Sequence, residues 1–189
     1  FIIMEKVFSP FEVTESIIKI DAKKWNLSCI GSIETEMEVK RITKSCAGVV
    51  KKTKIRGTGH GTGTISLHIP YDLYLKLYGM DGKTKLVDKV AAYGSDSVHP
   101  TFTYTGVGKD EDGVEVLIAI PCAVVSDGQK WNFENGTEEV QEIELAVEIL
   151  PDDNEQGMYC IPVEELPASI TRKKWLEEFD ATLVQKATA

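Results

Sequence analysis

The sequence predicts a mostly β protein: an antiparallel β-sandwich or partial barrel with one short packed helix, a long projecting early loop and a C-terminal arm bearing a second helix. Three observations lead to this fold. Apolar and polar residues alternate with a period of two in most of the 189-residue chain, which is typical of strands with one buried face. Hairpin-type dipeptides, Asp-Gly at 112–113 and 127–128 and Asn-Gly at 135–136, separate the later segments. Only two segments have a helical pattern instead.

The clearest strands are predicted at residues 33–40 and 142–149, where apolar residues occupy one face and three glutamates the other. The two glutamate rows are Glu34, Glu36 and Glu38, and Glu142, Glu144 and Glu148. In the first segment the expected buried residues are Ile33, Met37 and Val39. Further strands are predicted at residues 13–20, 49–56, 63–69, 100–105 and 114–125, the last two being rich in β-branched or aromatic residues.

A short helix over the sheet is predicted at residues 70–79. Pro70 stands where the first helical turn tolerates proline, and Gly79 stands where helices commonly end. Three apolar side chains lie near one stripe at i, i+4 and i+7 spacing, namely Tyr71, Leu75 and Tyr78.

The second helix is predicted in the C-terminal segment. We divide the chain into a β-sandwich domain at residues 1–150, with a projecting loop at about 43–62, and an arm at residues 151–189. Prolines punctuate the start of this arm. The apolar face of its helix is formed by Trp175, Leu176 and Phe179, which suit docking either on the chain's own sandwich or on a neighbouring subunit.

Charge is distributed unevenly along the chain. The net charge is −9, but residues 1–100 carry 15 basic and 11 acidic groups, whereas residues 101–189 carry 6 and 19. This asymmetry predicts two oppositely charged surfaces rather than one acidic coat.

The most basic segment runs from residue 40 to residue 56 and contains seven cations and no carboxylate. It lies between two predicted strands and is a candidate long hairpin or projecting loop. The seven cations, which are candidate contact residues, are Lys40, Arg41, Lys44, Lys51, Lys52, Lys54 and Arg56. Nucleic-acid binding would use such cations, but aromatic residues are not interleaved with them and the net charge opposes phosphate at long range. Contact with an acidic protein surface fits better, and a solvated loop is the simplest alternative.

No catalytic, cofactor or metal site is predicted. The glycine-rich run at residues 57–64 lacks the spacing of a phosphate-binding or dinucleotide-binding loop and precedes a strand, which favours a bulged or flexible strand start. The three histidines lack the spacing of metal ligands. The four cysteines form no Cys-x-x-Cys pair and are interpreted as free, semi-buried thiols.

The chain is expected to be soluble, without membrane contact, because no segment approaches the roughly 18 consecutive apolar residues of a membrane-spanning helix.

Several short segments follow one another in a characteristic order, although none of them is a chemical motif. In chain order they are Ile30-Gly31-Ser32-Ile33-Glu34, Gly61-Thr62-Gly63-Thr64, Leu67-His68-Ile69-Pro70-Tyr71, Tyr78-Gly79-Met80, Ala92-Tyr93-Gly94, His99-Pro100, Glu134-Asn135-Gly136-Thr137-Glu138-Glu139-Val140, Pro151-Asp152, Gly157-Met158-Tyr159 and the helix with Trp175. In this order of segments the chain resembles the major tail (tail tube) proteins of long-tailed bacteriophages, of the type found in phages of Gram-positive hosts. The resemblance is collective and covers about residues 24–184.

The resemblance implies a structural subunit without enzymatic activity. Members of this family form rings of six that stack into a hollow tube, and their inner strands join into one continuous β-barrel. A long loop and the terminal arms bridge neighbouring rings, and the tube delivers the genome to the host cell. The resemblance also implies other tail proteins as partners, such as the tape measure and tube terminators, and assembly in the host bacterial cytoplasm before residence in the virion tail.

Two roles for named residues follow as hypotheses. One or both glutamate rows face the lumen, where carboxylates repel the phosphates of DNA that passes without specific binding. The seven cations of residues 40–56 bridge to the next ring.

Two alternatives belong to other functional classes. The first is a β-sandwich binding module of a secreted or surface protein that recognises carbohydrate or protein. The second is a small hydrolase that uses paired glutamates, although evenly spaced glutamates on one strand more often form a solvated surface.

Overall fold

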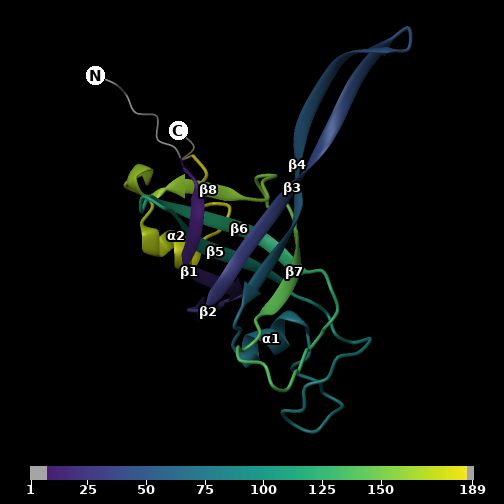
Figure 1. Ribbon diagram of the computed structural model, residues 1–189, viewed down its shortest axis with the longest axis vertical. Coiled ribbons are helices and arrows are strands. Elements are labelled where there is room, and N and C mark those ends of the chain that lie inside the picture. The colour runs from purple at the N-terminus through teal and green to yellow at the C-terminus, as the bar shows by residue number, and fades with distance from the viewer. Residues whose placement is uncertain (1–7, 187–189) are drawn as a thin grey trace.

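The computed structural model describes residues 8–186 and confirms a mostly β, antiparallel fold (Figure 1). Within these residues the strands are β1 Pro10–Ile20, β2 Lys23–Leu27, β3 Ile30–Cys46, β4 Val49–Leu67, β5 Thr101–Asp110, β6 Glu115–Val125, β7 Ile143–Ile149 and β8 Tyr159–Pro162. The helices are α1 Tyr71–Leu77 and α2 Arg172–Glu178, with a 3-10 turn at Val163–Glu165.

All eight strands belong to one open antiparallel sheet, in the order β2-β1-β5-β6-β7-β4-β3, with β8 attached to β6. The two ends of β6 have different partners on one edge. Residues 116–119 pair with β8, whereas residues 123–125 pair with β7. The sheet therefore divides into two halves that share β6. The first half contains β2, β1, β5, β6 and β8, and the second half contains β6, β7, β4 and β3. In Figure 1 the β3–β4 half crosses in front of the β5–β6 half, an arrangement that resembles a sandwich but does not close into a barrel.

The main hydrophobic core lies between these two halves. Ile18 and Trp25 from the first half pack in one cluster with Ile65 and Leu145 from the second. Such a core follows from strands with a period of two, because each strand directs every second side chain inward. The buried Tyr104 hydroxyl shares a 2.7 Å hydrogen bond with Ser16, and burial raises the pKa of Tyr104 to about 12.

Helix α1 covers one end of this core, as the sequence predicts for residues 70–79. Gly79 has the positive φ of 59° expected where the chain leaves a helix. The predicted apolar stripe is wrong at Tyr71, which is 64% exposed. Tyr78 is buried and Leu75 is partly buried against the core, as predicted. Leu73, Tyr74 and Leu77 complete the buried face. The helix has only seven residues, so its position over the core, rather than an i, i+7 repeat, decides which side chains are buried.

Helix α2 packs on the outer face of the first half, in a second hydrophobic cluster. Trp175, Leu176 and Phe179 are almost fully buried there against side chains of β1, β5 and β6. Thr171 caps the helix by accepting a hydrogen bond from the Lys174 backbone N–H at 3.1 Å.

Two polar contacts hold this helix in place. The Thr105 hydroxyl donates to the Leu176 carbonyl at 2.6 Å. Arg172 pairs at 2.6 Å with both Glu15 and Glu115, which lie on separate strands. Of the two docking sites left open by the sequence, the structure shows the chain's own sheet.

Several boundaries differ from the predictions. The short strands β2 and β8 are additional, although Trp25 and Leu27 of β2 show the alternation of a half-buried strand. The predicted hairpin turn at residues 112–113 joins β5 to β6 as expected. The dipeptides at 127–128 and 135–136 are not tight hairpin turns, because both lie in a long connection without strands, residues 126–142.

Of the long hairpin and the projecting loop that the sequence left open near residues 43–62, the structure shows the hairpin. Strands β3 and β4 continue beyond the body of the protein as a two-stranded hairpin (Figure 1). Only Ala47 and Gly48 form its turn, and both have positive φ, 52° and 76°. Val39, predicted to be buried, is 65% exposed because it lies where the hairpin leaves the core. We call residues 40–56 the arm, and we refer to residues 151–189 as the C-terminal segment.

The glycine-rich segment at residues 57–64 belongs to β4. Between Gly57 and Gly61 the β4 chain contains more residues than the opposing β3 segment from Met37 to Val39. This register shift confirms the predicted bulge, and Gly59 there has a φ of 81°.

Candidate functional site

The strand order brings two glutamates from each predicted row onto one face of the sheet. Strand β4 lies between β3 and β7. Glu36 is opposite Thr62, which is opposite Glu148 in the next strand. Directly opposed residues in a sheet direct their side chains to the same side. We define the acidic face by the residues Glu34, Glu36, Thr62, Thr64, Glu144 and Glu148.

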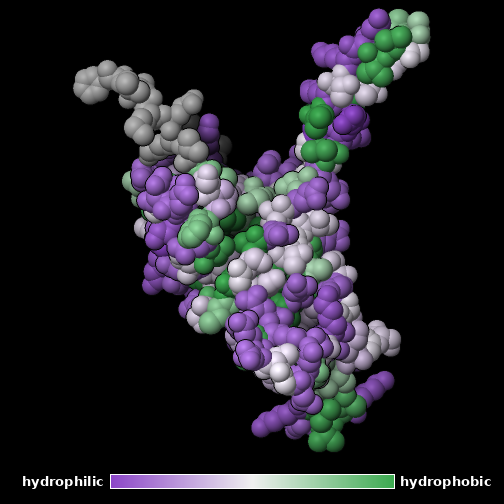
Figure 2. Space-filling view, in the orientation of Figure 1, coloured by the Kyte–Doolittle hydropathy of each residue, from purple (hydrophilic) through white to green (hydrophobic). Residues whose placement is uncertain are grey.

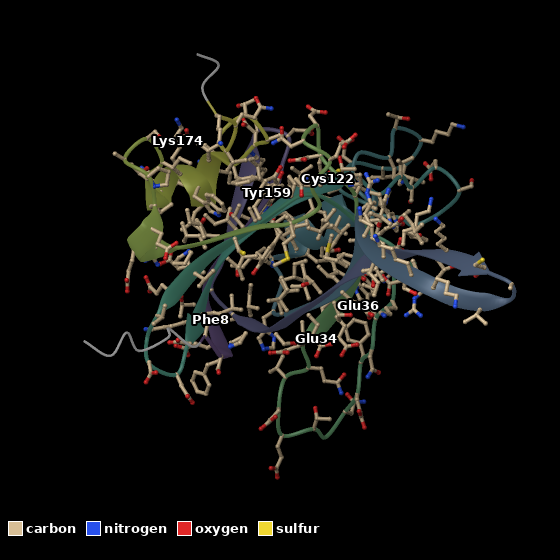
Figure 3. The ribbon with its side chains drawn as sticks, turned by 90° about the horizontal axis from the view of Figure 1, so that it is seen from above. Phe8, Glu34, Glu36, Cys122, Tyr159 and Lys174 are labelled. Carbon is tan, nitrogen blue, oxygen red and sulfur yellow. The ribbon has the colours of Figure 1, made fainter. Side chains whose placement is uncertain are left out.

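The acidic face is exposed to solvent, whereas the alternate residues of the same strands are buried. All four of its glutamates are exposed, while Ile65, Leu145 and Val147 form the core behind them. Threonines and small residues between the glutamates leave a shallow, open depression that reaches Ser126 and Ala146. Figure 3 shows Glu34 and Glu36 close together on β3, away from α2 and Lys174. Within residues 8–186 no cation forms an ion pair with these four carboxylates.

The other two predicted glutamates lie outside the acidic face. Glu142 precedes β7, and its carboxylate occupies the space that a Cβ atom on Gly31 would fill. Glu38 lies at the register shift, where its carbonyl accepts a hydrogen bond from the Thr58 hydroxyl at 3.4 Å. The prediction of strand residues at Glu142 is wrong because the pairing of β4 with β7 ends at Ile143.

The arm has one strongly basic face. The residues paired across it are Lys40 with Arg56, Ile42 with Lys54, and Lys44 with Lys52. Since these six positions alternate with the others along each strand, they form one face with five cations. The opposite face carries Arg41, Thr43 and the apolar Ile55, while Lys51 lies at another register shift near the turn.

The free arm is poorly stabilised by its own contacts. A two-stranded hairpin alone is marginally stable in water. Like charges directly opposite each other, as in the pairs Lys40–Arg56 and Lys44–Lys52, weaken it further. Its apolar side chains are also exposed, and Ile42, Val49, Val50 and Ile55 each have about half of their surface in solvent, from 46% to 59%. These features suit an arm that binds an anionic, partly apolar surface.

Replacing Ala47 with asparagine should stabilise the arm. A non-glycine residue with positive φ costs about 1 kcal/mol, and asparagine tolerates this conformation better than alanine. Amide hydrogen exchange in the arm should therefore slow by about fivefold, while exchange in the core stays unchanged. The matched control is Ala47→Val, whose β-branched side chain should accelerate exchange in the arm. Equal exchange rates in both variants would contradict the expected turn geometry.

The structure also presents an aromatic surface that the sequence interpretation missed. In residues 126–142, the side chains of Trp131, Phe133 and Val140 are 50%, 85% and 84% exposed. Three glutamates lie among them in sequence, Glu134, Glu138 and Glu139. Two aromatic residues flanking Asn132, in a segment without periodicity, were the available sequence indication. We call residues 126–142 the aromatic loop.

Features of an enzymatic or metal site are sparse in the described part of the chain. Residues 8–186 contain no group of three or more histidine, cysteine or acidic side chains able to hold a metal ion. The cysteines are free, but Cys29, Cys46 and Cys160 are exposed rather than semi-buried as predicted. Burial, and to a lesser extent Asp152, raises the pKa of the Cys122 thiol, which disfavours its nucleophilic thiolate form.

Within residues 8–186, no helix has both the length and the apolar character that crossing a membrane requires.

Comparison of the chain with protein-family models gave no match, and comparison with curated proteins gave none. Function is therefore argued from the acidic face, the basic arm and the aromatic loop.

Proposed function

We propose that the protein is a structural subunit of a bacteriophage tail tube, in which rings of six subunits stack into a hollow conduit that delivers the viral genome to the host cell. The observation that carries this proposal is the combination of an exposed acidic face on β3, β4 and β7 with a basic arm formed by the continuation of β3 and β4. A subunit with opposite charges at separate places is suited to repeated association with copies of itself.

The acidic face would line the lumen. Four exposed carboxylates that form no ion pair among residues 8–186 give this surface a negative potential. Such a surface repels DNA phosphates, whereas lysines would retain DNA through the release of counterions. DNA would therefore pass without specific binding.

Ring formation would use the open edges of the sheet. Strand β3 pairs only with β4 and strand β2 only with β1, so each has one edge without a partner strand among the described residues. Unpaired edges favour pairing with another chain. Edge-to-edge pairing around a ring would produce the continuous inner β-barrel of a tube and remove the exposed edges.

The arm would connect successive rings. Its five-cation face would bind an acidic surface of the adjacent ring, which would relieve the repulsion between the like-charged pairs. Under this proposal the other partners are tail proteins that set the length and close the ends of the tube, such as the tape measure and the terminators. Assembly would take place in the host bacterial cytoplasm, and the finished tube would belong to the virion.

Negative-stain electron microscopy of the purified full-length protein tests this function. We expect hollow rods or six-fold rings at high protein concentration. Monodisperse monomers that bind an oligosaccharide would overturn the proposal and favour a secreted or surface binding module. A glycosidase activity that is lost in Glu34→Gln or Glu148→Gln would instead favour a hydrolase.

A further inference from the structure

The arm tip and the aromatic loop form two exposed apolar surfaces at opposite ends of the molecule. The arm extends from the top of the body in Figure 1, and α1 lies toward the bottom. The aromatic loop is attached to α1, because Trp131 stacks on Tyr74 with ring centroids 5.9 Å apart. Figure 2 shows hydrophobic side chains at the arm tip, next to hydrophilic ones. Val49 and Val50 of this tip are each more than half exposed.

The aromatic loop is held in a defined conformation although it lacks strands. The Tyr74 hydroxyl donates to the Lys130 carbonyl at 3.0 Å, and Lys130 pairs with Asp127 at 2.7 Å. Across the loop, the Asn132 amide donates to Gln141 at 2.8 Å. Trp131 and Phe133 contact each other edge to face, 5.6 Å between centroids. A fixed loop with exposed aromatic side chains loses little conformational entropy on binding.

The charges of the two surfaces are opposite. Lys44, Lys51 and Lys52 flank the valines of the tip, whereas the aromatic loop carries Glu134, Glu138 and Glu139 near its apolar side chains. Contact between two tips, or between two loops, would place like charges together. Only contact between a tip and a loop combines apolar burial with opposite charges, so the pairing is specific for head-to-tail association.

We infer that the arm tip of one copy of this chain docks on the aromatic loop of another copy. Val49 and Val50 would pack against Trp131, Phe133 and Val140, and the tip lysines would pair with the loop glutamates. Exposed tryptophan and phenylalanine are residue types enriched in the centres of protein interfaces. The inference deepens the proposed function and rests on it for the head-to-tail stacking of rings, since it identifies the surface that receives the arm.

Charge exchange tests the contact directly. Lys51→Glu with Lys52→Glu should raise the protein concentration needed for assembly by about 100-fold or more, as should Glu138→Lys with Glu139→Lys, because like charges would then meet. All four reversals in one chain should restore assembly. The matched control is Lys173→Glu with Lys174→Glu on α2, which changes the charge equally but lies outside both surfaces and should assemble normally. Analytical ultracentrifugation measures association, and thermal unfolding checks that each variant folds.

Site-specific cross-linking provides a second measurement. Cys46 is exposed next to the arm tip. In Val140→Cys, a short thiol-reactive cross-linker should join Cys46 of one copy to residue 140 of another, and Cys46→Ser should abolish this product. Lys174→Cys should give no such product.

The outcomes separate this inference from the proposed function. Suppose that the wild-type protein forms tubes. If the lysine-pair variant and the glutamate-pair variant also assemble normally, or if the variant with all four reversals does not regain assembly, the tip–loop contact alone is overturned. Association that follows the charge-exchange pattern without producing tubes or rings would support the contact and overturn the proposed tube.

Discussion

A variant in which an Asn-Gly turn replaces residues 41–55 should fold normally and fail to polymerise. Lys40 and Arg56 are directly opposite each other, so a two-residue turn can close the shortened hairpin. Neither hydrophobic cluster contains a residue of the arm. The free energy of unfolding should therefore change by less than about 1 kcal/mol, as is usual for changes away from the core. Assembly should be lost because the arm supplies the contact between rings.

Thermal unfolding and electron microscopy together measure this result. The matched control is Ala47→Asn, which introduces the same Asn-Gly turn but retains the full arm and should form tubes. Tubes of normal length from the shortened chain would show that the arm does not connect the rings.

Reversing the charge of the acidic face should make the tube retain DNA. Replacing Glu34, Glu36, Glu144 and Glu148 with lysine changes the charge of each subunit by +8 on a surface whose carboxylates form no ion pair within residues 8–186. The side chains are exposed, so the fold should tolerate the change. DNA should then bind with a steep dependence on salt concentration, and a phage with this tube should deliver its genome slowly or not at all.

The measurements are DNA retention by purified tubes at several salt concentrations and the rate of genome ejection. Glutamine at the same four positions is the matched control, because it removes the repulsion without adding attraction and should give an intermediate result. Unchanged ejection from tubes of lysine-bearing subunits would show that the acidic face does not line the lumen.

Local patterns in the sequence predicted much of the fold. In β7, Leu145, Val147 and Ile149 are buried as the alternation predicts, and Glu144 and Glu148 are exposed. The pattern failed where a strand leaves the core. Val39 continues the alternation of β3, but it lies at the base of the arm, where no other element packs over it, and it is 65% exposed. Alternation alone specifies which residues share a face and not whether another element covers that face.

The acidic face could be predicted only in part. Each glutamate row was visible as a separate strand pattern. Their union depends on β4 lying between β3 and β7, which is a property of long-range pairing. The aromatic loop was missed because Trp131 and Phe133 belong to no periodic segment, and only the structure shows that α1 fixes them at the surface.

Because β6 belongs to both halves of the sheet, the fold lacks an independent unit that could open alone. Its residues hydrogen-bond to β5, β7 and β8, and side chains of β6 reach both hydrophobic clusters. Separating either half would expose core surface of the other, which is the condition for cooperative, two-state unfolding. The body can thus remain a single rigid unit while the arm, which contributes to neither cluster, exchanges between bound and free states.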